Sequence, residues 1–254
     1  MSRLRELRRQ ARAALALGWL NGVVAARRNP LWVLSYLAPP LSLLMMIKIF
    51  AVEEALNYAL IGGLLMTAAS NGLGIMGDAV FYKNTVKLQD MLVASPMRPL
   101  SYVAGLVLSS LLFAIPGFAI FGALMVSREL VGLESAPSVL FATLLATASL
   151  ACLGFTLATF VREERFVWPL LGILTFTLTI LPPVYYPIDR LPWALRLASL
   201  LVPTSNAAAL IHVEVGLVRP EELPVGEAAA WLVALVEAAL LAAAATYRSR
   251  WREA

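Results

Sequence analysis

Long apolar runs separated by short polar stretches dominate this chain of 254 residues. A helix needs about 20 apolar residues to cross the hydrocarbon core of a bilayer, within a range of about 17–25. Six segments reach or approach that length: 31–47, 55–77, 100–127, 136–161, 166–181 and 228–247. The pattern predicts an all-α integral membrane protein with six transmembrane helices.

The first 29 residues follow a different pattern. Leu4, Leu7, Ala11 and Leu15 recur at helical spacing, and arginines occupy the other faces. The apolar run that follows, 13–26, is too short to cross comfortably. Segment 1–29 is therefore predicted to be an amphipathic helix lying at the membrane interface. An uncleaved, signal-like anchor is the alternative.

A second departure from plain spans is segment 183–227. It is apolar but contains Pro203, Asn206 and His212, and a crossing here would reverse the side on which the C-terminal arginines lie. Irregular backbone at membrane depth survives only where protein or a cavity covers it. We expect two short helices on the outer side, broken near Pro203 and partly re-entrant. The rest of the chain divides into spans 1–3 in 30–127, spans 4–5 in 136–182, and the last span with its tail in 228–254.

Composition and charge agree with this picture. The chain is 60% hydrophobic and 14% charged, with a net charge of +4. Its basic residues punctuate the apolar runs instead of forming one surface, which argues against a nucleic-acid partner. With six spans, most Lys and Arg residues fall on the side of both termini, which predicts a multi-pass protein of the cytoplasmic membrane with both ends inside.

Few ionisable groups lie in or beside the predicted spans. Asp78 is close to a cytoplasmic end and fits an interfacial residue, whereas Glu237, mid-span, is either a satisfied interior carboxyl or a proton-coupling group. Asn71, among several glycines, favours close helix packing. Thr175 and Thr179 sit in a threonine series that spreads around its helix, so no single polar stripe is expected. All five are candidates for pathway or packing.

The cytoplasmic loop 81–100 combines polar side chains with an apolar side and ends in Ser95-Pro96 and Arg98-Pro99. We expect the loop to contain a short helix with one apolar side. A helix of this kind can dock into a groove of another protein. The competing interpretation is a connecting loop that lies on the headgroups.

Two stretches resemble a known family. The run Leu92-Val93-Ala94-Ser95-Pro96 before Pro99-Leu100, and the run from Pro187 to Pro192-Trp193 with Val202-Pro203-Thr204 further on, are similar to the corresponding segments of ABC-2 type permeases, the transmembrane subunits of ABC exporters. The resemblance implies that the loop couples the chain to an ATPase. The residues concerned are Lys83, Lys87, Gln89, Asp90, Met91, Leu92, Ser95 and Pro96.

The same resemblance implies an outer hairpin that closes the exit, with Tyr186, Pro187, Pro192, Trp193 and Pro203. The expected assembly has two ABC ATPase subunits and a second permease chain, as a homodimer in membrane lipid. The cargo is expected to be amphipathic, lipid-linked or drug-like.

The chain contains no Gly-Lys-Ser/Thr, so ATP and Mg²⁺ are expected on the partner ATPase and no cofactor on this chain, which is then not an enzyme. One His and one Cys, His212 and Cys152, exclude an intramolecular disulfide and give no metal or catalytic cluster. Two other classes stay open: an ion-coupled secondary transporter that uses Glu237, and a membrane enzyme or scaffold.

Overall fold

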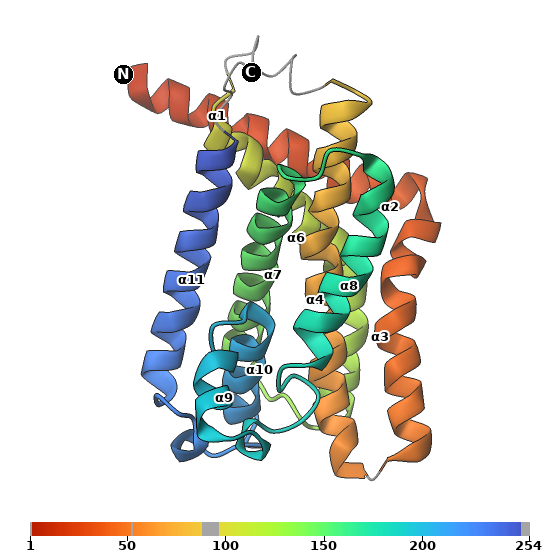
Figure 1. Ribbon diagram of the computed structural model, residues 1–254, viewed down its shortest axis with the longest axis vertical. Coiled ribbons are helices and arrows are strands. Elements are labelled where there is room, and N and C mark those ends of the chain that lie inside the picture. The colour runs from red at the N-terminus through yellow and green to blue at the C-terminus, as the bar shows by residue number, and fades with distance from the viewer. Residues whose placement is uncertain (1, 52, 88–96, 250–254) are drawn as a thin grey trace.

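The computed structural model describes residues 2–51, 53–87 and 97–249, and the regular structure among them is helical (Figure 1). The α-helices and the one π-helix, η1, are α1 (Ser2–Trp19), η1 (Leu20–Val24), α2 (Ala25–Arg28), α3 (Pro30–Phe50), α4 (Glu53–Asn84), α6 (Pro99–Ser127), α7 (Ala136–Ala158), α8 (Val167–Ile180), α9 (Trp193–Ser199), α10 (Pro203–Glu214) and α11 (Glu227–Arg248). Short 3₁₀ turns, η2 (Glu164–Phe166), η3 (Ile188–Arg190) and η4 (Pro220–Glu222), connect some of them.

Five of these helices, α3, α4, α6, α7 and α11, are long and apolar enough to cross a membrane. They correspond to five of the six predicted spans. The predicted span 166–181 is the exception, because α8 has 14 residues and is only about 21 Å long, against about 30 Å of hydrocarbon. The all-α membrane architecture is therefore present, and the sixth crossing stays a prediction.

The long helix α4 lies at the centre of the bundle. It contacts α3, α6, α7, α8 and α10, and its most apolar window is entirely buried. The corresponding windows of α3 and α11 are only 17% buried, and these helices lie at opposite edges of the bundle in Figure 1. A helix surrounded by protein must present apolar or small residues on every side, which explains the even distribution of apolar residues along 59–77.

Glycines bring the backbones of α4 and α7 close together. A Cβ atom added to Gly72 would lie 2.8 Å from Leu150 Cβ and 2.9 Å from the Thr147 carbonyl oxygen, and one added to Gly154 would lie 2.9 Å from the Leu73 carbonyl oxygen. Without a hydrophobic drive between helices in lipid, close packing of small residues is a main source of association. The interpretation of Gly72 as a packing residue fits this geometry.

Buried hydroxyl groups on α7 are satisfied within their own helix. Thr143 and Thr147 each donate to the carbonyl oxygen four residues earlier, at 2.8 Å and 2.7 Å. This local bonding removes the cost of an unpaired donor in an apolar interior. It allows α7 to carry threonines at buried positions.

The N-terminal segment runs across one end of the bundle, which we call the α1 end (Figure 1). α1 and η1 contact α6, and a Cβ on Gly105 would lie 2.8 Å from Leu17 Cδ2 and 3.1 Å from the Ala14 carbonyl oxygen. The predicted interfacial helix is thus also packed on the bundle through small residues.

The segment before α11 folds into two short helices at the opposite end of the bundle. α9 and α10 are bent by 107° relative to each other, and Pro203 begins α10. Pro fits the first turn of a helix because its missing N–H would have no partner there. The chain therefore bends at the proline where the sequence predicts a break, and α10 then lies buried against α4, α7 and α11.

Candidate functional site

A cavity of about 450 Å³ lies within the α1 end of the bundle. Its walls come from η1, α2, α3, α4, α6, η2 and α8, so the first, second, third and fifth predicted spans meet here. Its size is within the range of small-molecule sites, about 300–1,000 Å³.

Aromatic rings form much of one wall. Trp32 and Tyr36 lie one turn apart on α3; the Trp32 ring is 4.9 Å from the Trp168 ring of α8, and Tyr36 meets Phe113 of α6 edge-on at 5.9 Å. Offset and edge-to-face contacts between aromatic rings are stabilising and fix the ring orientations. The wall is therefore a set of mutually supported rings from three helices.

A second wall, against which the ring of Tyr36 packs, is one face of α4. Asn71, Gly74 and Asp78 have the spacing i, i+3, i+7, which places them on the same side of the helix. A Cβ at Gly74 would lie only 2.8 Å from the Tyr36 hydroxyl oxygen. The glycine thus lets the ring of Tyr36 reach α4, and the polar side chains of Asn71 and Asp78 lie on either side of it along the helix.

Two amides in the cavity wall have unused hydrogen-bonding atoms. Asn71 Nδ2 donates to the Thr67 carbonyl oxygen at 2.8 Å, and Asn21 Oδ1 accepts from the Tyr82 hydroxyl at 2.7 Å. Asn71 Oδ1 and Asn21 Nδ2 are buried and have no partner in the described parts of the chain. Buried polar atoms are normally satisfied, so an unused acceptor and an unused donor in one cavity indicate room for a polar ligand or water.

Asn21 reaches the cavity from η1, a single turn of π-helix between α1 and α2. Such turns shift the following side chains around the helix axis and are frequent at functional sites. Gly22 on the same turn is buried against Ser109 of α6, where an added Cβ would lie 2.9 Å from the Ser109 carbonyl oxygen.

Three charged residues line the cavity. Asp78 is solvent-accessible on the cavity wall and forms no ion pair within residues 4–51, 53–87 and 97–249. Arg28 and Glu164, both exposed, lie in the wall contributed by α2 and η2. The lining thus carries two carboxylates and one guanidinium, and it favours cations.

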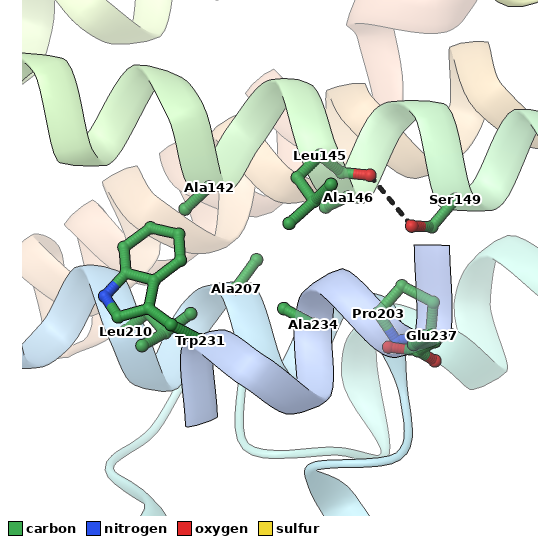
Figure 2. Close-up of a pocket in the computed structure, with 10 residues that line it drawn as sticks. All are labelled: Ala142, Leu145, Ala146, Ser149, Pro203, Ala207, Leu210, Trp231, Ala234 and Glu237. Atoms are coloured by element: carbon green, nitrogen blue, oxygen red, sulfur yellow. Dashed lines mark hydrogen bonds between the residues drawn. The ribbon is translucent and has the colours of Figure 1, made fainter. Parts of the chain in front are cut away.

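Glu237 lies elsewhere. It lines a separate cavity of about 10 Å³ between α7, α10 and α11, with Ser149 and Pro203 among its neighbours (Figure 2). That volume is about one water molecule. Ser149 donates to the Leu145 carbonyl oxygen at 2.9 Å, so it is already engaged (Figure 2).

The structure separates the other predicted pathway residues. Asn71 and Asp78 share the large cavity, whereas Thr175 and Thr179 are buried in α8 and are not among its lining residues. Thr179 donates to the Thr175 carbonyl oxygen at 2.6 Å. These two threonines have the geometry of packing residues.

Of the predicted coupling residues, Lys83 and Lys87 are exposed at the α1 end. Lys83 belongs to the last turn of α4, and Lys87 has a positive φ of 51° just beyond it. The remaining predicted coupling residues lie outside the described residues: Gln89, Asp90, Met91, Leu92, Ser95 and Pro96.

The predicted outer-hairpin residues gather around η3, α9 and α10. The Tyr186 hydroxyl donates to the Leu181 carbonyl oxygen at 2.6 Å, and Trp193 is 65% exposed. Pro187 precedes η3, Pro192 precedes α9, and Pro203 is buried at the start of α10. No described contact assigns them a gating role, which stays a prediction.

The aromatic wall was not predicted from the sequence. Trp32, Tyr36, Phe113 and Trp168 look like ordinary span residues because aromatic side chains are common in apolar runs. The i, i+4 spacing of Trp32 and Tyr36 gives them a shared face, but only the fold shows that this face meets Asp78.

A central buried helix, peripheral lipid-length helices and a polar, aromatic-lined cavity define a multi-pass membrane protein with a ligand-sized cavity at its α1 end. A family model described as ABC-2 family transporter protein matches residues 34–245. The chain belongs to this family, whose members are membrane permeases of ABC transporters. A search of curated proteins finds no match.

Proposed function

We propose that this chain is the transmembrane subunit of an ATP-driven exporter, and that a separate ABC ATPase binds at its α1 end, which faces the cytoplasm. The cargo is an amphipathic or drug-like molecule, which occupies the 450 Å³ cavity. Two permease chains and two ATPase subunits form the assembly.

The observation that carries the proposal is that loop 81–100 joins elements that build the cavity. On one side it continues α4, whose Asp78 and Phe81 line the cavity. Asn84 Nδ2 donates to the Arg162 carbonyl oxygen at 3.0 Å, and the Thr85 hydroxyl donates to Glu164 at 3.4 Å. The loop is therefore tied to the start of α8 as well as to α4.

The other side of the loop is tied to α1 and α6. Arg98 pairs with Glu6, and the Arg98 backbone N–H donates to Gln10 Oε1 at 2.9 Å. Arg98 directly precedes α6, which contributes Ser109 and Phe113 to the cavity. A partner that displaced the loop would thus act on the cavity walls formed by α4 and α8 and on the wall formed by α6. Coupling to an ATPase requires such a connection.

The surroundings of Glu237 support an ion-coupled mechanism less well than the large cavity and its loop support ATP-driven export. Its cavity of about 10 Å³ has a mainly apolar lining, and the large cavity uses a different carboxylate, Asp78. Transport driven by ATP on a partner subunit is the function that these positions favour.

The test is reconstitution with the partner ATPase. The tagged chain is expected to co-purify with a P-loop ATPase from membranes of its source and to raise its ATP hydrolysis. Reversing two exposed charges at the α1 end, Lys83→Glu with Lys87→Glu, should abolish both effects. Lys48→Glu, an equivalent change at the far end of α3, is the control and should retain them.

Recovery of the folded chain without any ATPase would overturn the proposal. An equal loss of co-purification in the Lys48→Glu control would reject the α1 end as the docking site.

A further inference from the structure

The wall chemistry of the 450 Å³ cavity narrows the class of ligand. The faces of Trp32, Tyr36 and Trp168 carry the negative potential of their π systems, and Trp faces attract organic cations most strongly. The ring centroids of Trp32 and Trp168 are 4.9 Å apart with an interplanar angle of 32°, so the two rings pack on each other and form one aromatic surface beside the cavity.

The α4 wall adds a carboxyl group, Asp78. Asp78 lies just beyond the predicted span 55–77 and has no ion-pair partner in the described part of the chain. The lining also contains one cation, Arg28 of α2, and a second carboxylate, Glu164. The charges of Arg28 and Glu164 balance each other. The cavity therefore retains one excess negative charge for a ligand.

The unused amide atoms specify the polar contacts. Asn71 is 6% exposed, its Nδ2 is engaged with Thr67, and its vacant atom is the acceptor Oδ1. An N–H donor from a ligand satisfies it. On another wall the vacant atom of Asn21 is the donor Nδ2, which suits an ether, carbonyl or sulfonyl oxygen.

We propose that this cavity binds an amphipathic organic ammonium ion, with the protonated amine against Asp78 and its apolar body among the aromatic rings. Asn71 lies about 10 Å further along α4, so a second N–H or O–H donor of the ligand meets its Oδ1. The proposal rests on the exporter function above and names its substrate class. Anionic and neutral amphipaths are disfavoured, because neither satisfies Asp78.

Monodansylcadaverine is a suitable probe, because it joins a primary ammonium to a fluorescent apolar sulfonamide. Its N-acetyl derivative has the same body without the charge. The purified chain in neutral maltoside micelles is titrated with each probe and binding is followed by dansyl fluorescence. We expect the ammonium probe to bind about tenfold or more tightly than the acetylated one.

The matched variants are Asp78→Asn and Glu163→Gln. Both exchange a carboxylate for its amide, but Glu163 is exposed, pairs with Arg165 and is not among the cavity-lining residues. Asp78→Asn should remove the preference for the ammonium probe and leave the acetylated probe unchanged, whereas Glu163→Gln should leave both affinities at their original values. This double cycle isolates the interaction between the probe charge and Asp78.

A second pair of variants tests the shape of the cavity. Gly74→Ala places a methyl group 2.8 Å from the Tyr36 hydroxyl and should weaken binding several-fold. Gly122→Ala, in α6 but outside the cavity lining, meets nothing within 4 Å and should have little effect. The comparison of the two probes on the unmodified chain remains decisive if a variant fails to fold.

Added lipids distinguish the sources of the ammonium group. Displacement of the probe by phosphatidylethanolamine, with none by phosphatidylglycerol, identifies a lipid headgroup as an occupant. No displacement by either lipid restricts the site to soluble amphipathic amines. Equal affinity for the two probes, or unchanged selectivity in folded Asp78→Asn, overturns the proposal. That outcome leaves the ATPase co-purification test of the exporter function unaffected.

Discussion

The close approach of α4 and α7 yields a sharp prediction for Gly154→Ala. The added Cβ would lie 2.9 Å from the Leu73 carbonyl oxygen, 3.0 Å from Leu73 Cα and 3.2 Å from the Gly72 carbonyl oxygen. Carbon contacts normally settle at about 3.5–4.0 Å. All three neighbours are backbone atoms of α4, so no side chain can rotate away and the two helices must separate.

Overpacking of this kind costs about 1–3 kcal/mol. Alanine also raises helix propensity by about 1 kcal/mol over glycine, which offsets part of the cost. Gly172→Ala is the matched control, because Gly172 lies in α8 and an added Cβ would meet nothing within 4 Å. The propensity gain is common to both variants, so Gly154→Ala should be about 1–3 kcal/mol less stable than Gly172→Ala.

Thermal unfolding in detergent measures this difference. Cys152 is the only cysteine and is 4% exposed, so a fluorogenic maleimide should react with it only as the bundle opens. At about 2–4 °C per kcal/mol, the Tm values should differ by several degrees. Because Cys152 lies two residues from Gly154, the substitution can change the reactivity of the thiol directly. Tryptophan fluorescence therefore follows unfolding as a second signal. Equal Tm values for the two variants would refute the argument that backbone contact fixes the distance between α4 and α7.

Three further predictions concern other parts of the chain. The first tests the orientation in a Cys152→Ser background. Leu133→Cys, in the exposed α6–α7 connection, should react with an impermeant maleimide in intact cells, whereas Arg162→Cys should react only after permeabilisation. The reverse pattern would contradict the proposed orientation. Tyr82→Phe removes the donor to Asn21 Oδ1 and should lower the free energy of unfolding by about 1 kcal/mol, more than Tyr186→Phe near the surface; equal Tm losses would count against a buried bond. Glu6→Gln removes the exposed ion pair with Arg98 and should lower the free energy of unfolding by at most about 1 kcal/mol. Added salt should abolish this difference between variant and parent, because it screens the ion pair. A larger, salt-independent loss of Tm would argue against a surface ion pair.

The spans could be predicted because each apolar run carries its own signal. Length and hydropathy locate α3, α4, α6, α7 and α11 without knowledge of their neighbours. The break at Pro203 was equally local, since Pro at the first turn of α10 follows from its missing N–H. The helix ends could not be predicted in the same way, because hydropathy marks where an apolar run ends and not where the helix ends. α4 continues to Asn84, beyond the predicted span end at 77.

The cavity could not be predicted because it depends on which helix faces meet. Asp78 looked like an interfacial carboxylate, and nothing in the local sequence places Trp32 or Trp168 opposite it. The orphaned acceptor of Asn71 is likewise invisible without coordinates, because an asparagine near glycines suits helix packing equally well. In the structure, Asn71 serves both purposes: one amide atom bonds its own helix, and the other is left at the cavity.

The contact between Gly72 and Gly154 has a mechanical consequence for a transport cycle. With backbone against backbone at this point, we expect α4 and α7 to move together in a transport cycle. A change in cavity volume would then come from the elements on its other sides, α3 and α8 among them. The carboxylate of Asp78 would then keep its position relative to α7, while Trp32 and Trp168 would move relative to it.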